Sequence, residues 1–111
     1  MNTFKEVDFA VTLCSKEGII TYMNDKAVRT FERDGGLKLI GTNVLDCHPE
    51  PSKSLLAKML ENEMKNVYTI EKNGVKKLIY QTPIYENGVY SGFAELSLEL
   101  PEHMENFIRN S

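Results

Sequence analysis

The stretch Gly18-Ile19-Ile20-Thr21-Tyr22-Met23-Asn24-Asp25-Lys26-Ala27 changes from a strand pattern to a helix pattern at a single asparagine. Residues 19–23 are mostly β-branched or aromatic and follow a Lys-Glu-Gly turn, which is typical of a strand that leaves a hairpin. The short amide of Asn24 can accept a hydrogen bond from a backbone N–H two or three residues later. We therefore expect Asn24 to end the strand and to cap a helix that runs from Asp25 toward Phe31.

The sequence before and after this stretch extends the pattern. Residues 8–14 alternate large apolar side chains with small or polar ones, as a strand does, and residues 15–18 form the hairpin turn. Residues 34–36 read Asp-Gly-Gly and break the chain, and residues 37–51 hold short apolar clusters that predict helical turns and loops.

A longer helix and three strands are expected in the second half. Ser52 is a candidate cap for a helix whose apolar residues recur every three or four positions, at Leu55, Leu56, Met59, Leu60 and Met64. Residues 67–72 and 75–82 flank an Asn-Gly pair, the strongest short hairpin signal, and residues 89–98 follow another turn. Pro101 is expected to start a last short helix.

Length and charge limit the classes of protein to which this chain can belong. A chain of 111 residues with 41% hydrophobic and 26% charged residues predicts one globular domain, with a core at 8–98 and flanking segments at 1–7 and 101–111. A net charge of −3 provides no basic field for nucleic acid or anionic lipid, and no apolar run is long enough to span a bilayer. We expect no nucleic-acid or membrane partner, a cytoplasmic location, and free thiols at Cys14 and Cys47.

The expected element order predicts an α+β fold, a five-stranded antiparallel sheet with helices packed on one face. Over nearly the whole chain this order resembles a PAS domain, a family with a glycine, an isoleucine, an aromatic residue and an asparagine at its second strand and first helix. Gly41-Thr42-Asn43-Val44 and Gly92 extend the resemblance. The resemblance implies a small sensory cup between the sheet and the helices.

A ligand would lie between the sheet and the long helix. We expect the even-numbered residues of the last two strands to face inward, with small Gly92 and Ala94 leaving volume for a cavity. The predicted ligand-binding residues are Leu56, Met59 and Leu60 on the helix, and Leu78, Tyr80, Thr82, Gly92 and Ala94 on the strands. Tyr90 and Leu96 belong to the same inward-facing set. This lining suits a small apolar or mixed-polarity ligand; the alternative is that the same side chains close a dry core.

The resemblance also allows the family's best-known cofactors to be tested by position. Its photosensory flavin members carry a reactive cysteine directly after the glycine-x-asparagine segment, where this chain has Val44. Its oxygen-sensing haem members hold the iron by a histidine on the long helix, at a position that we match to Leu56. We therefore expect neither a flavin–cysteinyl adduct nor haem bound in that way, and no cofactor is predicted.

Catalytic and metal sites are not expected. Cys47 and His48 are adjacent, but neighbouring side chains of an extended segment point opposite ways, and no third orienting group is identifiable. Cys14, Cys47, His48 and His103 do not have zinc-ligand spacing. We predict no enzyme and no metal.

Two functions remain open. The leading hypothesis is a ligand-binding or small-molecule-sensing PAS module in signal transduction, with the output carried by a protein partner. The alternative is a PAS-type interaction or dimerisation module whose core is filled by side chains. The volume enclosed by Leu56, Met59, Leu60, Tyr80 and Gly92 separates them.

Apolar residues on the terminal segments suggest assembly. The candidate interface residues are Phe4, Val7, Met104, Phe107 and Ile108. A symmetric homodimer would bury them against their copies. The alternative is that they fold back over the open face of the sheet as a cap.

Overall fold

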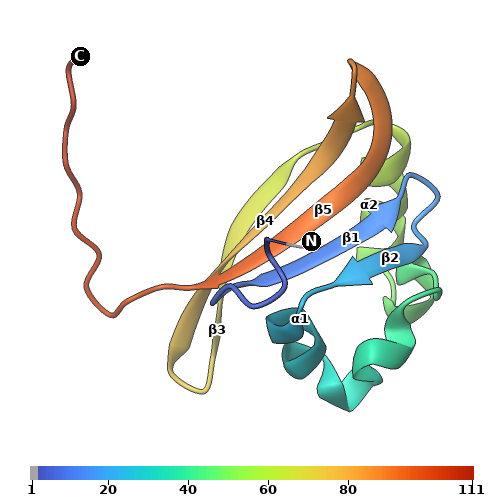
Figure 1. Cartoon of the computed structure of the whole chain (residues 1–111), viewed down its shortest axis with the longest axis horizontal. Coiled ribbons are helices and arrows are strands. Elements are labelled where there is room, and N and C mark those ends of the chain that lie inside the picture. The colour runs from blue at the N-terminus through green and yellow to red at the C-terminus, as the bar shows by residue number, and fades with distance from the viewer. Residues whose placement is uncertain (1–2) are drawn as a thin grey trace.

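The computed structural model describes residues 3–111 and has one antiparallel sheet of five strands in the order β2-β1-β5-β4-β3 (Figure 1). The strands are β1 (Ala10–Ser15), β2 (Ile20–Met23), β3 (Asn66–Lys72), β4 (Val75–Glu86) and β5 (Val89–Glu99). The helices are α1 (Asp25–Thr30) and α2 (Ser52–Glu61), with short 3-10 turns η1 (Glu32–Asp34), η2 (Gly36–Leu39) and η3 (Val44–Cys47). The predicted α+β fold is confirmed.

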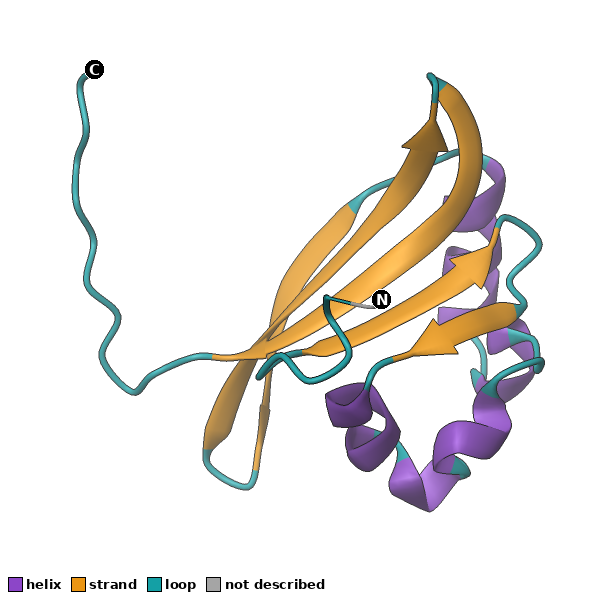
Figure 2. Ribbon diagram, in the orientation of Figure 1, coloured by secondary structure: helices purple, strands orange, loops and turns teal. Residues whose placement is uncertain are grey.

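The helices gather on one side of the sheet, toward β1 and β2, while the β3–β4 hairpin projects beyond them (Figure 2). Nearly all of β3 is exposed as a result. Within residues 3–111, no helix has the length and hydropathy needed to cross a bilayer.

Asn24 joins β2 to α1 and is fully buried. Its Oδ1 accepts hydrogen bonds from the backbone N–H of Ala27 (3.0 Å) and of Val11 (2.9 Å). Its Nδ2 donates to the carbonyls of Phe4 and Phe9, each at 2.9 Å. The predicted N-cap is confirmed, and the same amide also ties the helix to β1 and to the N-terminal segment.

The hairpins form at the predicted turns. Asn73 and Gly74 both have positive φ (53° and 79°), as an Asn-Gly hairpin turn requires. The strand β4 runs on to Glu86, past the predicted end at Thr82. Pro83 is tolerated inside β4 because β3 pairs with β4 only as far as Gln81, so no β3 carbonyl faces the missing N–H.

Two details of α2 differ from expectation. Ser52 does not cap the helix: Pro51 is the N-cap, and the carboxylate of Glu50 accepts from the backbone N–H (2.8 Å) and the hydroxyl of Ser54. Of the predicted stripe, Met59 and Leu60 are buried and Leu56 is half-buried, but Leu55 is 51% exposed and Met64 lies beyond the helix end. The covered stripe of α2 is therefore narrower than the sequence period predicts.

The predicted last helix does not form. Residues 101–111 leave the end of β5 as an extended segment that runs away from the sheet (Figure 1). So short a segment cannot hold a helix unless its apolar side is packed against something. Phe107 and Ile108 are 66% and 82% exposed, so that packing is missing in the single chain.

The inward register was predicted wrongly for most of β4 and β5. Paired residues of an antiparallel sheet share a face, and Glu95 pairs with both Thr12 and Gln81, while Ala94 pairs with Leu13 and Thr82. The odd-numbered residues Ile79, Gln81, Phe93, Glu95 and Ser97 face the helices, and Leu78, Tyr80, Thr82, Ala94 and Leu96 face outward. On β5 the cause is an irregularity between Ile84 and Tyr85, opposite Tyr90–Gly92, which exchanges the two faces of that strand. On β4 the odd-numbered residues face the helices on both sides of the irregularity, so the predicted parity was wrong along the whole strand.

Candidate ligand cavity

A cavity of about 440 Å³ lies between the sheet and the helices. On one side it meets a cluster centred on Ala10, Ile20, Met23 and Ala27, and on the other a cluster of Met59, Leu60 and Phe93. Val44 packs against both clusters. The cavity volume falls within the usual range for small-molecule sites, about 300 to 1,000 Å³.

Asn43 fixes the wall that carries Val44. Its Oδ1 accepts from the backbone N–H of Leu45 (2.9 Å) and begins η3, and its Nδ2 donates to the carbonyl of Glu17 in the β1–β2 turn. The backbone N–H of Val44 also donates to the carbonyl of Gly18 at 2.8 Å. Because of these bonds, η3 is held against the end of β1 and β2, and Val44 is placed over the cavity.

The floor of the cavity is polar at its centre. Glu95 on the central strand β5 is half-buried, and its Oε1 accepts a hydrogen bond of 2.8 Å from Nε2 of Gln81 on β4. Tyr68 on β3 lies next to this pair: burial and the negative charge of Glu95 raise the pKa of its hydroxyl, and a hydrogen bond with Gln81 lowers that pKa in part. The cavity floor therefore carries hydrogen-bond donors and acceptors, and the side chains around them are apolar.

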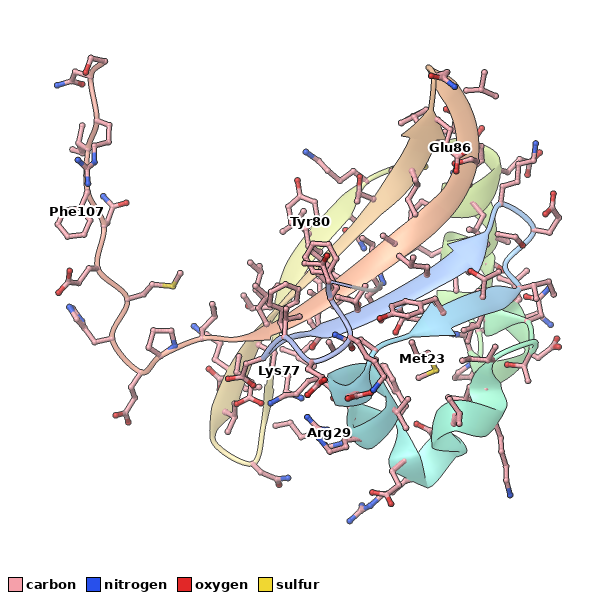
Figure 3. The ribbon with its side chains drawn as sticks, viewed as in Figure 1. Met23, Arg29, Lys77, Tyr80, Glu86 and Phe107 are labelled. Carbon is pink, nitrogen blue, oxygen red and sulfur yellow. The ribbon has the colours of Figure 1, made fainter. Side chains whose placement is uncertain are left out.

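One open side of the cavity, which we call the mouth, lies along β3 and the β3–β4 hairpin. Tyr68, Ile70 and Lys72 of β3 border it and are exposed, and Lys77 of β4 is half-buried there. Figure 3 places Lys77 near the hairpin end of β4 and Glu86 at its far end. A small molecule could therefore enter beside β3 without displacing a helix.

The two cysteines of the cavity have different surroundings. Burial, with a smaller contribution from the charge of Glu95, raises the pKa of Cys14 to about 11, so this thiol is protonated at neutral pH. Cys47 is exposed at the rim. Nδ1 of His48 lies 2.6 Å from the carbonyl of Val44, and among residues 3–111 no hydrogen bond joins His48 to Cys47.

The structure brings together only some of the predicted site residues. Leu56 and Leu60 border the cavity, and Met59 is buried in the cluster beside it. Ala94 also borders the cavity, although its strand position belongs to the outer face. Tyr90 lies on the helix side, where its hydroxyl donates to the carbonyl of Leu60 at 2.8 Å. Leu78, Tyr80, Thr82 and Leu96 lie on the outer face, and Gly92 is packed against β1. Contact of any of these residues with a ligand stays a prediction.

Sequence reasoning missed the polar floor. Gln81 and Glu95 are odd-numbered, so the prediction that the even-numbered residues of these strands face inward left both of them out of the site. One signal was available: Glu95 interrupts the otherwise apolar run Phe93-Ala94-Glu95-Leu96 in the middle of a long strand.

Several solved structures share this architecture. The PAS domain of the histidine kinase ThkA superposes with a TM-score of 0.60, at 19% identity over 83% of this chain and 99% of that one. The chain has a PAS fold. A sensory box histidine kinase from Vibrio cholerae matches at 17% identity and a TM-score of 0.62, over 86% of this chain and 84% of that one.

A third PAS-fold match is the Aer2 receptor from Vibrio cholerae, described as a dual PAS-heme oxygen sensor. It has 17% identity and a TM-score of 0.68, over 84% of this chain and 95% of that one. At these identities the likeness is one of fold. No protein-family model matches the sequence, and no curated protein matches it.

The residues of this PAS fold do not suit haem held from α2. The α2 residues at the cavity are Leu56 and Leu60, which carry no ligand atom. Among residues 3–111, no three His, Cys, Asp or Glu side chains are grouped as a metal site requires. His48 is exposed, and its Nδ1 is held by the carbonyl of Val44.

Proposed function

We propose that this chain is a PAS-fold sensory module that binds a small molecule in the cavity and passes the signal to a protein partner. The observation that carries the proposal is the space of about 440 Å³ between the sheet and the helices, which side chains from both layers line. The polar floor adds support, because a half-buried carboxylate and amide are costly beside a core and useful in a binding site. No enzymatic activity is proposed.

A change in occupancy would be transmitted through the packing of the walls. Val44 joins the two clusters, and Asn43 ties η3 to the β1–β2 turn. A ligand that contacts Val44 and Phe93 would bind one arrangement of these walls more tightly than another, and this difference in affinity sets how far the equilibrium shifts. The alternative, an interaction module without ligand, requires the cavity to close in solution.

We expect the freshly purified protein to be colourless and to carry a small molecule. Val44 and Leu56 stand where the resemblance would require a photoreactive cysteine and a haem-ligating histidine. An absorption spectrum should therefore lack flavin and haem bands, and native mass spectrometry should find an added mass that denaturation removes. Stoichiometric flavin or haem absorbance would contradict the first expectation, and a bare chain mass would favour the interaction module.

We also propose that the chain forms a homodimer through the outer sheet face and the C-terminal segment. Phe4, Phe9, Val11, Leu13, Tyr22 and Leu96 line an apolar groove on that face. The hydroxyl of Tyr22 is buried without a hydrogen-bond partner within residues 3–111. Met104, Phe107 and Ile108 of a second copy would supply apolar side chains at helical spacing, with Phe107 far from the body of its own chain (Figure 3).

The N-terminal segment fits the cap alternative better than the interface. The ring of Phe4 lies 6.3 Å from that of Phe9, and the carbonyl of Lys5 accepts from the backbone N–H of Asp25 at 3.0 Å. Val7 is half-buried. These contacts support a place for the N-terminal segment in the fold of its own chain, where Phe4 lines the groove.

Sedimentation velocity tests the homodimer. We expect wild type to sediment as a dimer at tens of micromolar, and a Phe107→Glu, Ile108→Glu variant to sediment as a monomer with unchanged circular dichroism. The matched control is Arg109→Glu, Asn110→Glu, which adds the same number of acidic residues beside the apolar pair. A wild type that is monomeric at this concentration contradicts the proposal.

A further inference from the structure

The cavity floor carries the carboxylate of Glu95, which has no ion pair within the described residues. The ion pairs within residues 3–111 join Lys5 to Asp25 and Lys26 to Asp8 and Glu99. In the same part of the chain, the hydrogen-bond partner of the Glu95 side chain is the neutral amide of Gln81.

The neighbours of Glu95 do not neutralise it. Across the sheet Glu95 is flanked by Thr12 on β1 and Gln81 on β4, both half-buried. Cys14 and Tyr68, the ionisable groups that feel its charge, have raised pKa values and are neutral at pH 7. A half-buried carboxylate with one amide partner keeps unused acceptor positions, and these suit a ligand with N–H donors.

The nearest cationic side chains of the cavity lie at its mouth. Lys77 is four residues from Gln81 on β4, which corresponds to about 13 Å along the strand. Lys77 pairs across the sheet with Glu99, not with Glu95. Because Lys77 is too far along the sheet to pair with Glu95, a cation at the floor has to come from the ligand.

We propose that the cavity binds a small molecule with a protonated nitrogen, an amine or amidine on a mainly apolar body, whose N–H groups donate to Glu95. This inference rests on the proposed ligand-binding function and names the ligand class. The apolar body would lie against Val44, Leu56 and Phe93, which line the same cavity. Gln81 would hold the carboxylate in place for the ligand nitrogen.

Three probes with one ring system test the proposal: tryptamine is cationic, indole-3-acetate is anionic, and indole has no side chain. Their affinities are measured by titration followed by NMR, after removal of any co-purified molecule by unfolding and refolding. We expect tryptamine to bind wild type most tightly, and Glu95→Gln to weaken tryptamine binding at least about tenfold with little effect on indole. Glu86→Gln, the matched control, removes the same charge at the exposed far end of β4 and should leave tryptamine binding within about twofold of wild type. Lys77→Gln removes the positive charge at the mouth and serves as the variant for the anionic probe.

Each outcome decides a different point. Tightest binding of indole-3-acetate, lost in Lys77→Gln, would overturn the assignment of a cation and leave the ligand-binding function intact. Binding of tryptamine no tighter than indole to wild type would also overturn it, and this comparison holds even if Glu95→Gln fails to fold. Absence of binding by all three probes, together with a bare mass in native spectrometry, would overturn the proposed function as well.

Discussion

Replacing Asn24 with alanine is expected to lower the free energy of unfolding by about 3 to 5 kcal/mol, a large part of the stability of a small domain. The four hydrogen bonds of the side chain are lost at once, and the buried N–H of Val11 keeps no partner in its place. Loss of the helix cap alone costs about 1 kcal/mol. Chemical denaturation followed by circular dichroism measures the change.

An aspartate at position 24 separates the acceptor role of the Asn24 amide oxygen from the donor role of its amide nitrogen. Asn24→Asp keeps the acceptor for Ala27 but places an oxygen opposite the carbonyls of Phe4 and Phe9. Burial beside these carbonyls would raise the pKa of the new carboxyl in the folded state above its unfolded value of about 4. Relative to wild type, the variant should be most stable below about pH 4 and should lose stability as the pH rises through the folded pKa. Wild-type stability of Asn24→Asp at pH 7 would show that the amide donors contribute little.

Replacing Gly92 with valine is expected to destabilise the sheet by about 1 to 3 kcal/mol or more. The physical reason differs from the one that the sequence suggested, which was the lining of a cavity. A Cβ at position 92 would lie 2.7 Å from the carbonyl oxygen of Cys14 on the neighbouring strand β1. Since that atom belongs to a paired backbone, β1 and β5 would have to separate locally.

Thermal denaturation of two variants checks this account. Gly92→Ala should already lower the melting temperature, because its added methyl group meets the same oxygen. Ser91→Ala, at the exposed neighbouring position, removes only a weak hydrogen bond of 3.3 Å to the carbonyl of Ile84 and should change little. Equal melting temperatures for Gly92→Ala and wild type would mean that β1 and β5 accommodate the added methyl group without loss of stability.

The elements that the sequence predicted well are those specified by local chemistry. Asn24 and the Asn73-Gly74 turn act within a few residues of themselves, so their roles follow from the sequence. The face of each strand depends instead on pairing with distant strands. The sequence correctly placed Tyr90 toward the helices. The prediction then kept even-numbered residues facing inward along all of β5. Because of the irregularity opposite Tyr85, this put every later residue of β5 on the wrong face.

The two faces of the sheet also carry an unusual distribution of polar and apolar side chains. The outer sheet face carries apolar Val11, Leu13, Leu78, Tyr80 and Leu96, and the inner face carries Thr12, Gln81 and Glu95. The inner face also carries apolar Ile79 and Phe93, so the departure from the usual arrangement lies in the polar residues at the cavity and in the apolar outer face. A polar floor suits a ligand cavity, and an apolar outer face suits a second protein surface, so both departures coincide with the proposed sites. The missing C-terminal helix has a related cause, since its partner surface is absent from a single chain.

The central claim is that a small molecule occupies the space between Val44, Phe93 and Glu95. Methyl-labelled NMR spectra of the protein as purified, and again after unfolding, dialysis and refolding, test it most directly. We predict that the methyl signals of Ile20, Leu56 and Ile79, which line the cavity, shift when the bound molecule is removed, while those of Leu13 and Leu78 on the outer face stay in place. Identical spectra before and after, or shifts confined to the outer face, would contradict the account.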